Sequence, residues 1–236
     1  MNKLFNLSFY RDNEEKLIKD IFESQNAIIF TPNIDHIIKI SKDDTLFKQY
    51  SMADFIIADG WPLSFTGRLI GYRINRITGV DVMDRLLEKA NKRNLNVFFL
   101  GAEEMTVNKL KRNIENKYLE IGNIGIHNGF FNDDEQVIKL INNNNTDILF
   151  VGMGCPKQEK WIMNNRDKIK CNIMIGIGGA LKIYSEEVKR APKYIQKLGL
   201  EWFYRFCKEP KRLFKRYFIE YLKFIPIFFN ELRKKR

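Results

Sequence analysis

Residues 147–161 read DILFVGMGCPKQEKW, and this stretch decides the fold that the sequence predicts. The apolar run Ile148–Val151 ends at the turn Gly152-Met153-Gly154, and a helical pattern begins at Pro156. Apolar runs of this length are typical of strands that are buried on both faces of a parallel sheet. Proline is well suited to the first position of a helix. The stretch therefore predicts a strand, a glycine turn and a helix in succession.

The same succession of strand, turn and helix recurs along the chain. Strand-helix alternation implies right-handed βαβ units, in which helices cover both faces of a parallel sheet. The sequence therefore predicts an α/β fold with a doubly wound, mostly parallel sheet. Further strands are predicted at 27–30, 55–58, 97–100 and 173–175, and helices at 80–92, 103–118, 133–144 and 156–169.

Residues 189–236 differ in charge from the rest of the chain. They contain 15 Lys and Arg but only 4 Asp and Glu, a surplus that equals the net charge of +11 of the whole chain, so residues 1–188 are neutral. Such a surplus suits a surface for anions, either lipid headgroups or nucleic acid. We therefore expect an α/β core over 1–188 and a C-terminal appendage over 189–236.

The appendage is also rich in aromatic residues and has a helical periodicity. We expect a helix or a helix pair over 193–209 and a further helix from Lys211 to about Phe224, which Pro226 bends or ends. Charged residues and Pro226 interrupt the apolar run, which is therefore shorter than the roughly 20 residues that a membrane span needs. We expect the appendage to lie on a membrane without crossing it. One stripe of the second helix holds Phe214, Tyr217, Phe218, Tyr221, Leu222 and Ile225.

The cysteine and histidine content excludes several kinds of site. Three cysteines without CxxC spacing indicate free thiols in a reducing cytoplasm, and no N-terminal stretch has the pattern of a signal peptide. With His36 and His127 as the only histidines, a His-rich metal centre is excluded and Ser-His-Asp chemistry is not expected. The glycine cluster at 176–179 is not a complete GxGxxG fingerprint, and the chain has no Walker A loop and no DxD triplet. We therefore expect neither a metal nor a cofactor.

Polar residues and glycines follow the predicted strands, where parallel α/β sheets bind ligands. Asp59 is either a partly buried carboxylate whose raised pKa suits a general base, or a turn or N-cap residue. Thr31 and Asn33 can hydrogen-bond sugar hydroxyls, or Asn33 can simply cap the next helix. Gly152 and Gly154 either let the backbone approach a ligand or form a tight turn without one.

Gln158 and three arginines complete the candidate binding residues. Gln158 stands in the first turn of the helix predicted from Pro156, where its amide can hydrogen-bond a sugar or a base. In the absence of a DxD triplet, a diphosphate would have to be neutralised by Arg, Lys or helix N-termini. Arg205, Arg212 and Arg216 stand among the aromatic residues of the appendage and either serve this purpose or form a solvated basic face.

Taken together, these motifs resemble the WecG/TagA/CpsF family of bacterial glycosyltransferases. The matching segments occur in the family's order and cover nearly the whole chain. Many members have an acidic residue and a glycine shortly before RAP, where this chain has Lys182 and Glu186, and this departure leaves the donor sugar open. The segments are TPNIDHI from Thr31, ADGWP from Ala58, ITGVDVMDRL from Ile77, VFFLGA from Val97, GFF from Gly129, DILFVGMGCPKQEKW from Asp147, GIGGAL from Gly176, RAPKY from Arg190 and LEWFYRFCKEPKRLFKRY from Leu200.

The resemblance implies a fold, an activity and a setting. Members have a Rossmann-like core and transfer N-acetylmannosamine, or a related sugar, from a UDP donor to undecaprenyl-diphosphate-linked N-acetylglucosamine. The transfer serves teichoic acid, capsule or other cell-surface polysaccharide synthesis, inverts the anomeric centre and has no evident metal requirement. The implied location is cytoplasmic, peripheral on the inner face of the cell membrane, with homo-oligomer formation left open. By motif position, the resemblance implies Asp59 as the catalytic base, Thr31, Asn33 and Gln158 as sugar- and acceptor-site residues, and Arg205, Arg212 and Arg216 as basic residues of a membrane-contacting appendage.

Three other interpretations stand beside this one. The nearest is a transferase of the same family with a different UDP-sugar donor. Another nucleotide-dependent α/β enzyme, such as a dinucleotide oxidoreductase, is disfavoured by the incomplete glycine fingerprint. A nucleic-acid-binding protein with a basic tail is disfavoured by the neutral core and the amphipathic tail, so no nucleic-acid partner is expected.

Overall fold

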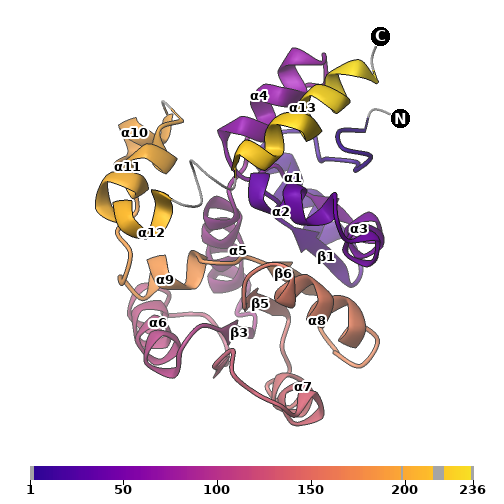
Figure 1. Cartoon of the computed structure of the whole chain (residues 1–236). Coiled ribbons are helices and arrows are strands. Elements are labelled where there is room, and N and C mark those ends of the chain that lie inside the picture. Colours follow the sequence, from indigo (N-terminus) through magenta and orange to yellow (C-terminus); the bar gives the residue numbers. More distant parts are fainter. Residues whose placement is uncertain (1–2, 198, 215–220, 235–236) are drawn as a thin grey trace.

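The computed structural model describes residues 3–197, 199–214 and 221–234. Its centre is a sheet with the strand order β2-β1-β6-β5-β3-β4, in which all neighbouring strands pair in parallel (Figure 1). This arrangement confirms the predicted parallel α/β sheet. The strands are β1 (Ala27–Phe30), β2 (Phe55–Ile56), β3 (Val97–Gly101), β4 (Ile124–His127), β5 (Ile148–Gly152) and β6 (Ile173–Gly176).

Helices connect the strands, and several begin at side chains that cap them. Asn33, Asp43, Thr78 and Asp133 each accept a hydrogen bond from a backbone N–H in the first turn of the following helix. These N–H groups have no partner within the helix itself, so the caps favour a start at these residues. The helices up to residue 188 are α1 (Glu14–Glu23), α2 (Ile34–Ile40), α3 (Asp44–Ser51), α4 (Trp61–Leu69), α5 (Gly79–Arg93), α6 (Glu104–Lys117), α7 (Asp134–Asn143), α8 (Lys157–Asn165) and α9 (Ala180–Tyr184). Beyond residue 188 lie α10 (Lys193–Lys197), α11 (Glu201–Lys208), α12 (Pro210–Phe214), the 3-10 helix η2 (Tyr221–Lys223) and α13 (Phe224–Arg233).

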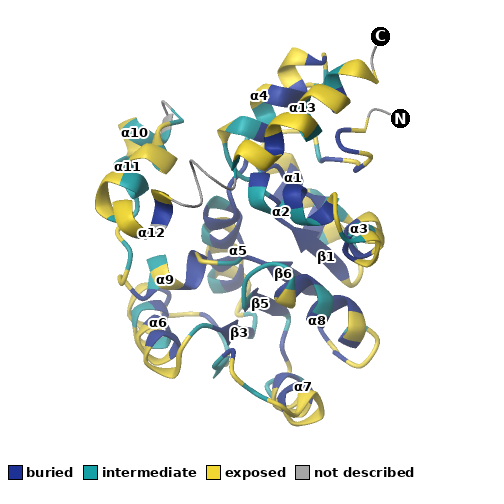
Figure 2. Ribbon diagram, in the orientation of Figure 1, coloured by how far each residue is buried: buried dark blue, intermediate teal, exposed yellow. Residues whose placement is uncertain are grey.

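Two apolar clusters, one on each face of the sheet, form the core. Side chains alternate between the faces along each strand, so Phe30 and Ile29 belong to different clusters. The Phe30 cluster packs against α2, α3, α7 and α8, whereas the Ile29 cluster packs against α1, α5, α6 and α9. The strands at the centre are buried on both sides (Figure 2). The sheet is therefore doubly wound, as the alternation of strands and helices predicts.

Strand β4 is the one strand of the described sheet that the sequence did not reveal. It pairs with β3 at the edge of the sheet, and all four of its residues are only half-buried. Gly125 and His127 interrupt the apolar residues, so no continuous apolar run marks the strand. An edge strand needs less burial than a central one, and its sequence signal is weaker for the same reason.

The described end of the appendage returns to the core. Phe224, at the start of α13, is buried, and the buried Glu231 accepts a hydrogen bond from the backbone N–H of Phe5 at 2.7 Å. Figure 1 shows α13 beside the N-terminal segment. The prediction that Pro226 bends or ends a helix was wrong, because Pro226 lies in the first turn of α13. A first-turn residue needs no helical partner for its N–H, so proline is tolerated there. Tyr217 and Phe218 of the predicted stripe lie outside the described residues.

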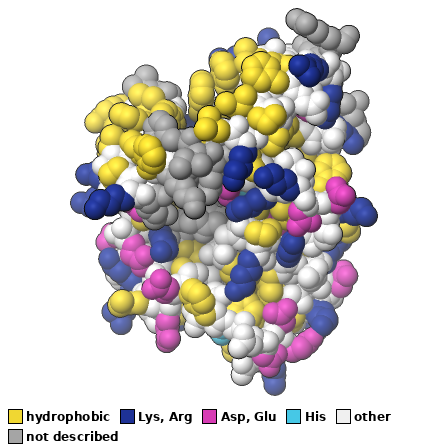
Figure 3. All heavy atoms as spheres, in the orientation of Figure 1, with side chains coloured by type: hydrophobic (Ala, Val, Ile, Leu, Met, Phe, Trp, Pro, Cys, Tyr) yellow, Lys and Arg dark blue, Asp and Glu magenta, His cyan; other side chains and the backbone are white. Residues whose placement is uncertain are grey.

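None of the helices in the described parts of the chain combines the length and apolar character that a bilayer crossing requires. Exposed apolar side chains instead gather on α4, α10, α11 and α13, which lie at one end of the molecule (Figure 3). We call this surface the apolar rim. Its residues are Trp61, Phe65, Leu69, Tyr194, Leu200, Trp202, Phe203, Ile225 and Phe229.

Candidate active site

A cavity of about 370 Å³ opens where β1 and β2 end. The strand-end loops, the starts of α4 and α5, and residues of the appendage form its walls. The cavity thus lies at the carboxyl ends of parallel strands, the place where such sheets bind ligands. Its lining comprises Asn33, Ile34, Asp59, Gly60, Trp61, Pro62, Arg76, Thr78 and Val80 from the core and Gly199, Glu201, Trp202, Arg205 and Tyr221 from the appendage.

Asp59 is the carboxylate that the core contributes to this cavity. Its backbone N–H donates a hydrogen bond of 2.9 Å to the carbonyl of Pro32, which ties the ends of β1 and β2 together. Burial raises the pKa of Asp59 from 3.8 to about 6, against the opposing effect of the positive charges of Arg205 and Arg76. The negative charges of Glu201 and Asp81 raise the pKa further. A carboxylate with this pKa is largely ionised at neutral pH and is a stronger base than an ordinary aspartate.

Two guanidinium groups and one carboxylate stand beside Asp59. Glu201 pairs with Arg76 at 2.9 Å and with Arg205 at 3.8 Å. The Nε atom of Arg205 is buried and has no hydrogen-bond partner among the described residues. A buried donor without a partner is costly, so this atom favours an anionic or hydrogen-bonding ligand in the cavity. The site therefore combines a carboxylate of raised pKa with groups that can neutralise a negative charge.

The appendage is held to the core by ion pairs at this cavity. Arg190 pairs with Glu201 at 3.5 Å, with Asp84 at 3.4 Å and with Asp81. Arg76 of the core also donates to the carbonyl of Gln196 at 3.0 Å. The contacts that position α11 are thus the contacts that bring Arg205 to Asp59.

The predicted residues Asn33, Asp59 and Arg205 meet in the cavity. Asn33 also caps α2, its Oδ1 accepting from the backbone N–H of Asp35 at 3.0 Å, so the capping interpretation is confirmed, and its contact with a sugar stays a prediction. Arg212 belongs to α12, but its side chain lies outside the described atoms, as does the whole of Arg216. Their roles stay predictions.

Thr31 and Gln158 are buried near the strand ends, and the two glycines nearby are partly buried. Thr31 donates a hydrogen bond of 3.0 Å to the carbonyl of Gly176, and Gln158 accepts one of 3.0 Å from the N–H of Gly178. The described lining of the cavity includes neither side chain. A Cβ on Gly152 would meet Leu181 at 2.5 Å, whereas Gly154 has a φ of +79° and open space around it. The contacts predicted between these residues and a substrate remain predictions.

Sequence reasoning did not single out Arg76 or Glu201. Arg76 stands in a loop between α4 and α5, outside any apolar pattern, and Glu201 is one of several charges in the appendage. Only the tertiary contact between the two residues shows that they belong to the site. The tryptophans Trp61 and Trp202 lie on the cavity wall and in the apolar rim at once.

A carboxylate with a raised pKa beside two guanidinium groups, at the strand ends of a doubly wound sheet, is an arrangement typical of α/β enzymes that act on anionic substrates. The profile of the Glycosyl transferase WecG/TagA/CpsF family matches residues 3–236, and the chain belongs to this family of glycosyltransferases.

Two named relatives agree with this assignment. A protein of Staphylococcus aureus (strain MW2) is 33% identical over 224 residues, which cover 93% of this chain and 85% of the relative. A protein of Bacillus subtilis (strain 168) is 36% identical over 208 residues, which cover 88% of this chain and 80% of the relative. Each of these two proteins is named N-acetylglucosaminyldiphosphoundecaprenol N-acetyl-beta-D-mannosaminyltransferase.

Proposed function

We propose that this chain transfers N-acetylmannosamine from UDP to N-acetylglucosaminyl-diphosphoundecaprenol in the synthesis of a cell-surface polysaccharide. The names of the relatives support the acceptor and the transferred sugar. The observation that carries the proposal is the cavity in which Asp59, with a pKa of about 6, faces Arg205 and Arg76. One end of this site can activate a hydroxyl group while the other stabilises a departing diphosphate.

In the proposed mechanism, Asp59 accepts the proton of the acceptor hydroxyl. The freed oxygen attacks the anomeric carbon from the face opposite UDP, so the new glycosidic bond forms as the bond to the diphosphate breaks. The electron pair of that bond leaves with UDP, and the anomeric configuration inverts. General-base catalysis of this kind contributes about 10²–10⁴-fold to the rate.

The charge of the diphosphate is met by arginines in this proposal. Arg205 can offer its Nε, which has no hydrogen-bond partner among the described residues, and Arg76 pairs with Oε2 of the same Glu201 whose Oε1 pairs with Arg205. Guanidinium groups form short, charge-assisted hydrogen bonds with phosphate oxygens and neutralise the charge that develops on the leaving group. We therefore propose that the transfer needs no metal ion.

The apolar rim supports a peripheral position on the inner face of the cell membrane. Trp61 and Trp202 are 46% and 42% exposed and stand at the mouth of the cavity. The polyprenyl chain of the acceptor can then stay in the bilayer while its diphospho-sugar enters the cavity. The basic appendage adds attraction to anionic headgroups, at about 1 kcal/mol for each Lys or Arg near the surface.

The experiment that tests the function is a panel of UDP-sugars with a synthetic lipid-diphosphate-N-acetylglucosamine acceptor. Products are identified by mass spectrometry, and the Asp59→Asn variant serves as the control for contaminating activity. We expect one N-acetylhexosamine to be added with UDP-N-acetylmannosamine. Transfer from another UDP-sugar alone would replace the donor in this proposal, and transfer from none of them would refute the proposal.

A further inference from the structure

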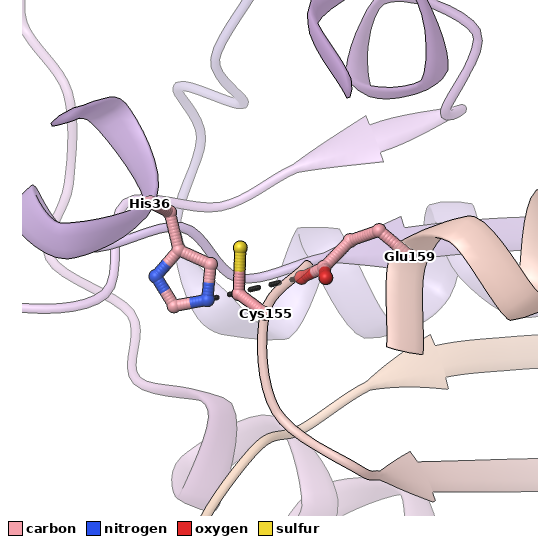
Figure 4. Close-up of side chains that lie close together, drawn as sticks. All are labelled: His36, Cys155 and Glu159. Atoms are coloured by element: carbon pink, nitrogen blue, oxygen red, sulfur yellow. Dashed lines mark ion pairs between the residues drawn. The ribbon is translucent and has the colours of Figure 1, made fainter. Parts of the chain in front are cut away.

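A cluster of three potential metal ligands lies beside the β5–α8 turn. His36 comes from α2, whereas Cys155 and Glu159 come from the turn and the first helical turn that follow β5 (Figure 4). One ligand atom of each residue lies within 4.8 Å of the others, and His36 Nε2 is 3.8 Å from Glu159 Oε1. Figure 4 shows the imidazole, the thiol and the carboxylate pointing into the same small space.

Glu159 has a buried oxygen atom that nothing described in the fold satisfies. The residue is fully buried, and its Oε1 accepts hydrogen bonds from Tyr50 at 2.8 Å and from Gln158 at 3.0 Å. Its Oε2 is buried and has no hydrogen-bond partner among the described residues. A buried carboxylate is stable when it is paired or coordinates a metal, so this atom points to a cation.

Asn33 contacts the ring nitrogen of His36 that points away from Glu159. Its Nδ1 lies 2.9 Å from Oδ1 of Asn33 and 3.2 Å from the backbone nitrogen of Asn33, whose N–H it accepts in the tautomer with the proton on Nε2. A metal at Nε2 selects the other tautomer, in which Nδ1 donates to Oδ1 of Asn33 and the capping bond from the backbone N–H is given up. The lone pair of Nε2 then faces Glu159 (Figure 4). A hydrogen bond from the other ring nitrogen to an oxygen is the usual support of a histidine ligand.

We propose that His36, Cys155 and Glu159 form a zinc site. Imidazole, thiolate and carboxylate are the donors that Zn²⁺ takes in proteins, in a tetrahedral arrangement with bonds of about 2.0–2.3 Å. The distance of 3.8 Å between the nitrogen and oxygen donors needs only a small contraction to meet this geometry. On binding, the Cys155 thiol releases its proton to solvent as the zinc–sulfur bond forms. The fourth position is left for a water molecule.

The charge of the site is balanced when zinc is bound. One thiolate and one carboxylate offset the two positive charges of the ion, and the imidazole is neutral. A neutral complex suits a place where Glu159 is fully buried and the His36 side chain is 12% exposed. The described lining of the Asp59 cavity includes none of the three ligands, so the site joins α2 to α8 and is not a part of the proposed transfer chemistry.

Cobalt substitution of the full-length protein tests the site directly. The chelator-treated protein is titrated with Co²⁺, and the spectrum is followed for a thiolate-to-cobalt charge-transfer band and the intense visible bands of tetrahedral cobalt. We expect one Co²⁺ per chain, displaced by one Zn²⁺, and a higher Tm with Zn²⁺. These readouts do not depend on transferase activity, so the outcome is separate from that of the proposed function.

Cysteine variants show which thiol is bound. Cys155→Ser should lose the charge-transfer band, bind Zn²⁺ at least tenfold more weakly and lose the rise in Tm. Cys207→Ser removes an exposed thiol away from the cluster and should behave as the wild type. The site would be disproved by the absence of the band from the wild type, or by its survival in Cys155→Ser.

Discussion

Replacing Asp59 with asparagine removes the proton acceptor of the cavity and keeps nearly the same side-chain shape. Because an amide cannot take the hydroxyl proton, turnover should fall by about 10²–10⁴-fold, the usual contribution of a general base. The affinity for UDP should be unchanged, since Arg76 and Arg205 remain. In the wild type, kcat/KM should fall about tenfold for each pH unit below about 6, the pKa of Asp59.

The same substitution should stabilise the protein at neutral pH. The pKa of Asp59 is raised from 3.8 to about 6 in the fold, so the folded state holds the proton more tightly than the unfolded chain. This contribution to stability is fully present below pH 3.8 and is lost as the pH rises through about 6. Above that, the ionised carboxylate costs up to about 3 kcal/mol relative to the neutral form, and asparagine removes this cost.

Turnover and stability should thus change in opposite directions in Asp59→Asn. Turnover is measured with a water-soluble acceptor, and Tm is measured by calorimetry at pH 5 and pH 8. The increase in Tm should be larger at pH 8, at about 2–4 °C for each kcal/mol in a chain of this size. Turnover close to that of the wild type would remove Asp59 from the role of base. A Tm that falls equally at both pH values would show that burial does not raise its pKa.

Three further predictions concern the surroundings of the cavity. Glu201→Gln removes a negative charge that raises the pKa of Asp59, so the fall of kcat/KM on the acidic side of the pH profile should move to lower pH. A move to higher pH would contradict this arrangement of charges. Excess EDTA should change turnover by no more than about twofold relative to the untreated enzyme, because arginines neutralise the diphosphate, and it should lower the Tm of the zinc-loaded protein. A loss of turnover that added metal restores would contradict the proposed role of the arginines. Phe229→Glu should weaken binding to vesicles of phosphatidylglycerol and phosphatidylethanolamine at least about tenfold, because it loses apolar burial and adds repulsion. The control Leu119→Glu changes an 83% exposed residue outside the apolar rim and should bind like the wild type; equal losses in both variants would remove the rim from this role.

The central strands could be predicted because their sequence signal is local. The strands β1, β3, β5 and β6 match the predicted apolar runs to within one residue. Strand β2 is shorter than predicted, since Ile57 and Ala58 are buried but lie beyond the paired residues. The half-exposed β4 had no such run. Burial on both faces therefore decides how clearly a strand of this sheet can be read from the sequence.

The candidate site could be predicted only in part. Asn33 and Asp59 follow from the rule that ligands bind at strand ends, and Arg205 from the need to neutralise a diphosphate without a DxD triplet. The partners of these residues depend on contacts between distant segments. Glu201 reaches Arg76 from the appendage, and His36 reaches Glu159 from another helix. No spacing within one segment encodes either contact, which is why the expectation of no metal site overlooked the cluster at His36.

The position of Glu201 connects the appendage with the chemistry proposed for the core. Its carboxylate pairs with Arg76 of the core and with Arg190 and Arg205 of the appendage, at 2.9, 3.5 and 3.8 Å. The charges of Glu201, Arg76 and Arg205 are also among those that set the pKa of Asp59. A displacement of α11 would therefore change both the pKa of Asp59 and the position of Arg205, which we propose neutralises the leaving group. Trp202 of α11 is also part of the apolar rim, so a surface that binds the rim would contact the helix that carries Glu201 and Arg205. We therefore propose that contact of the rim with a membrane would change the pKa of Asp59 through α11.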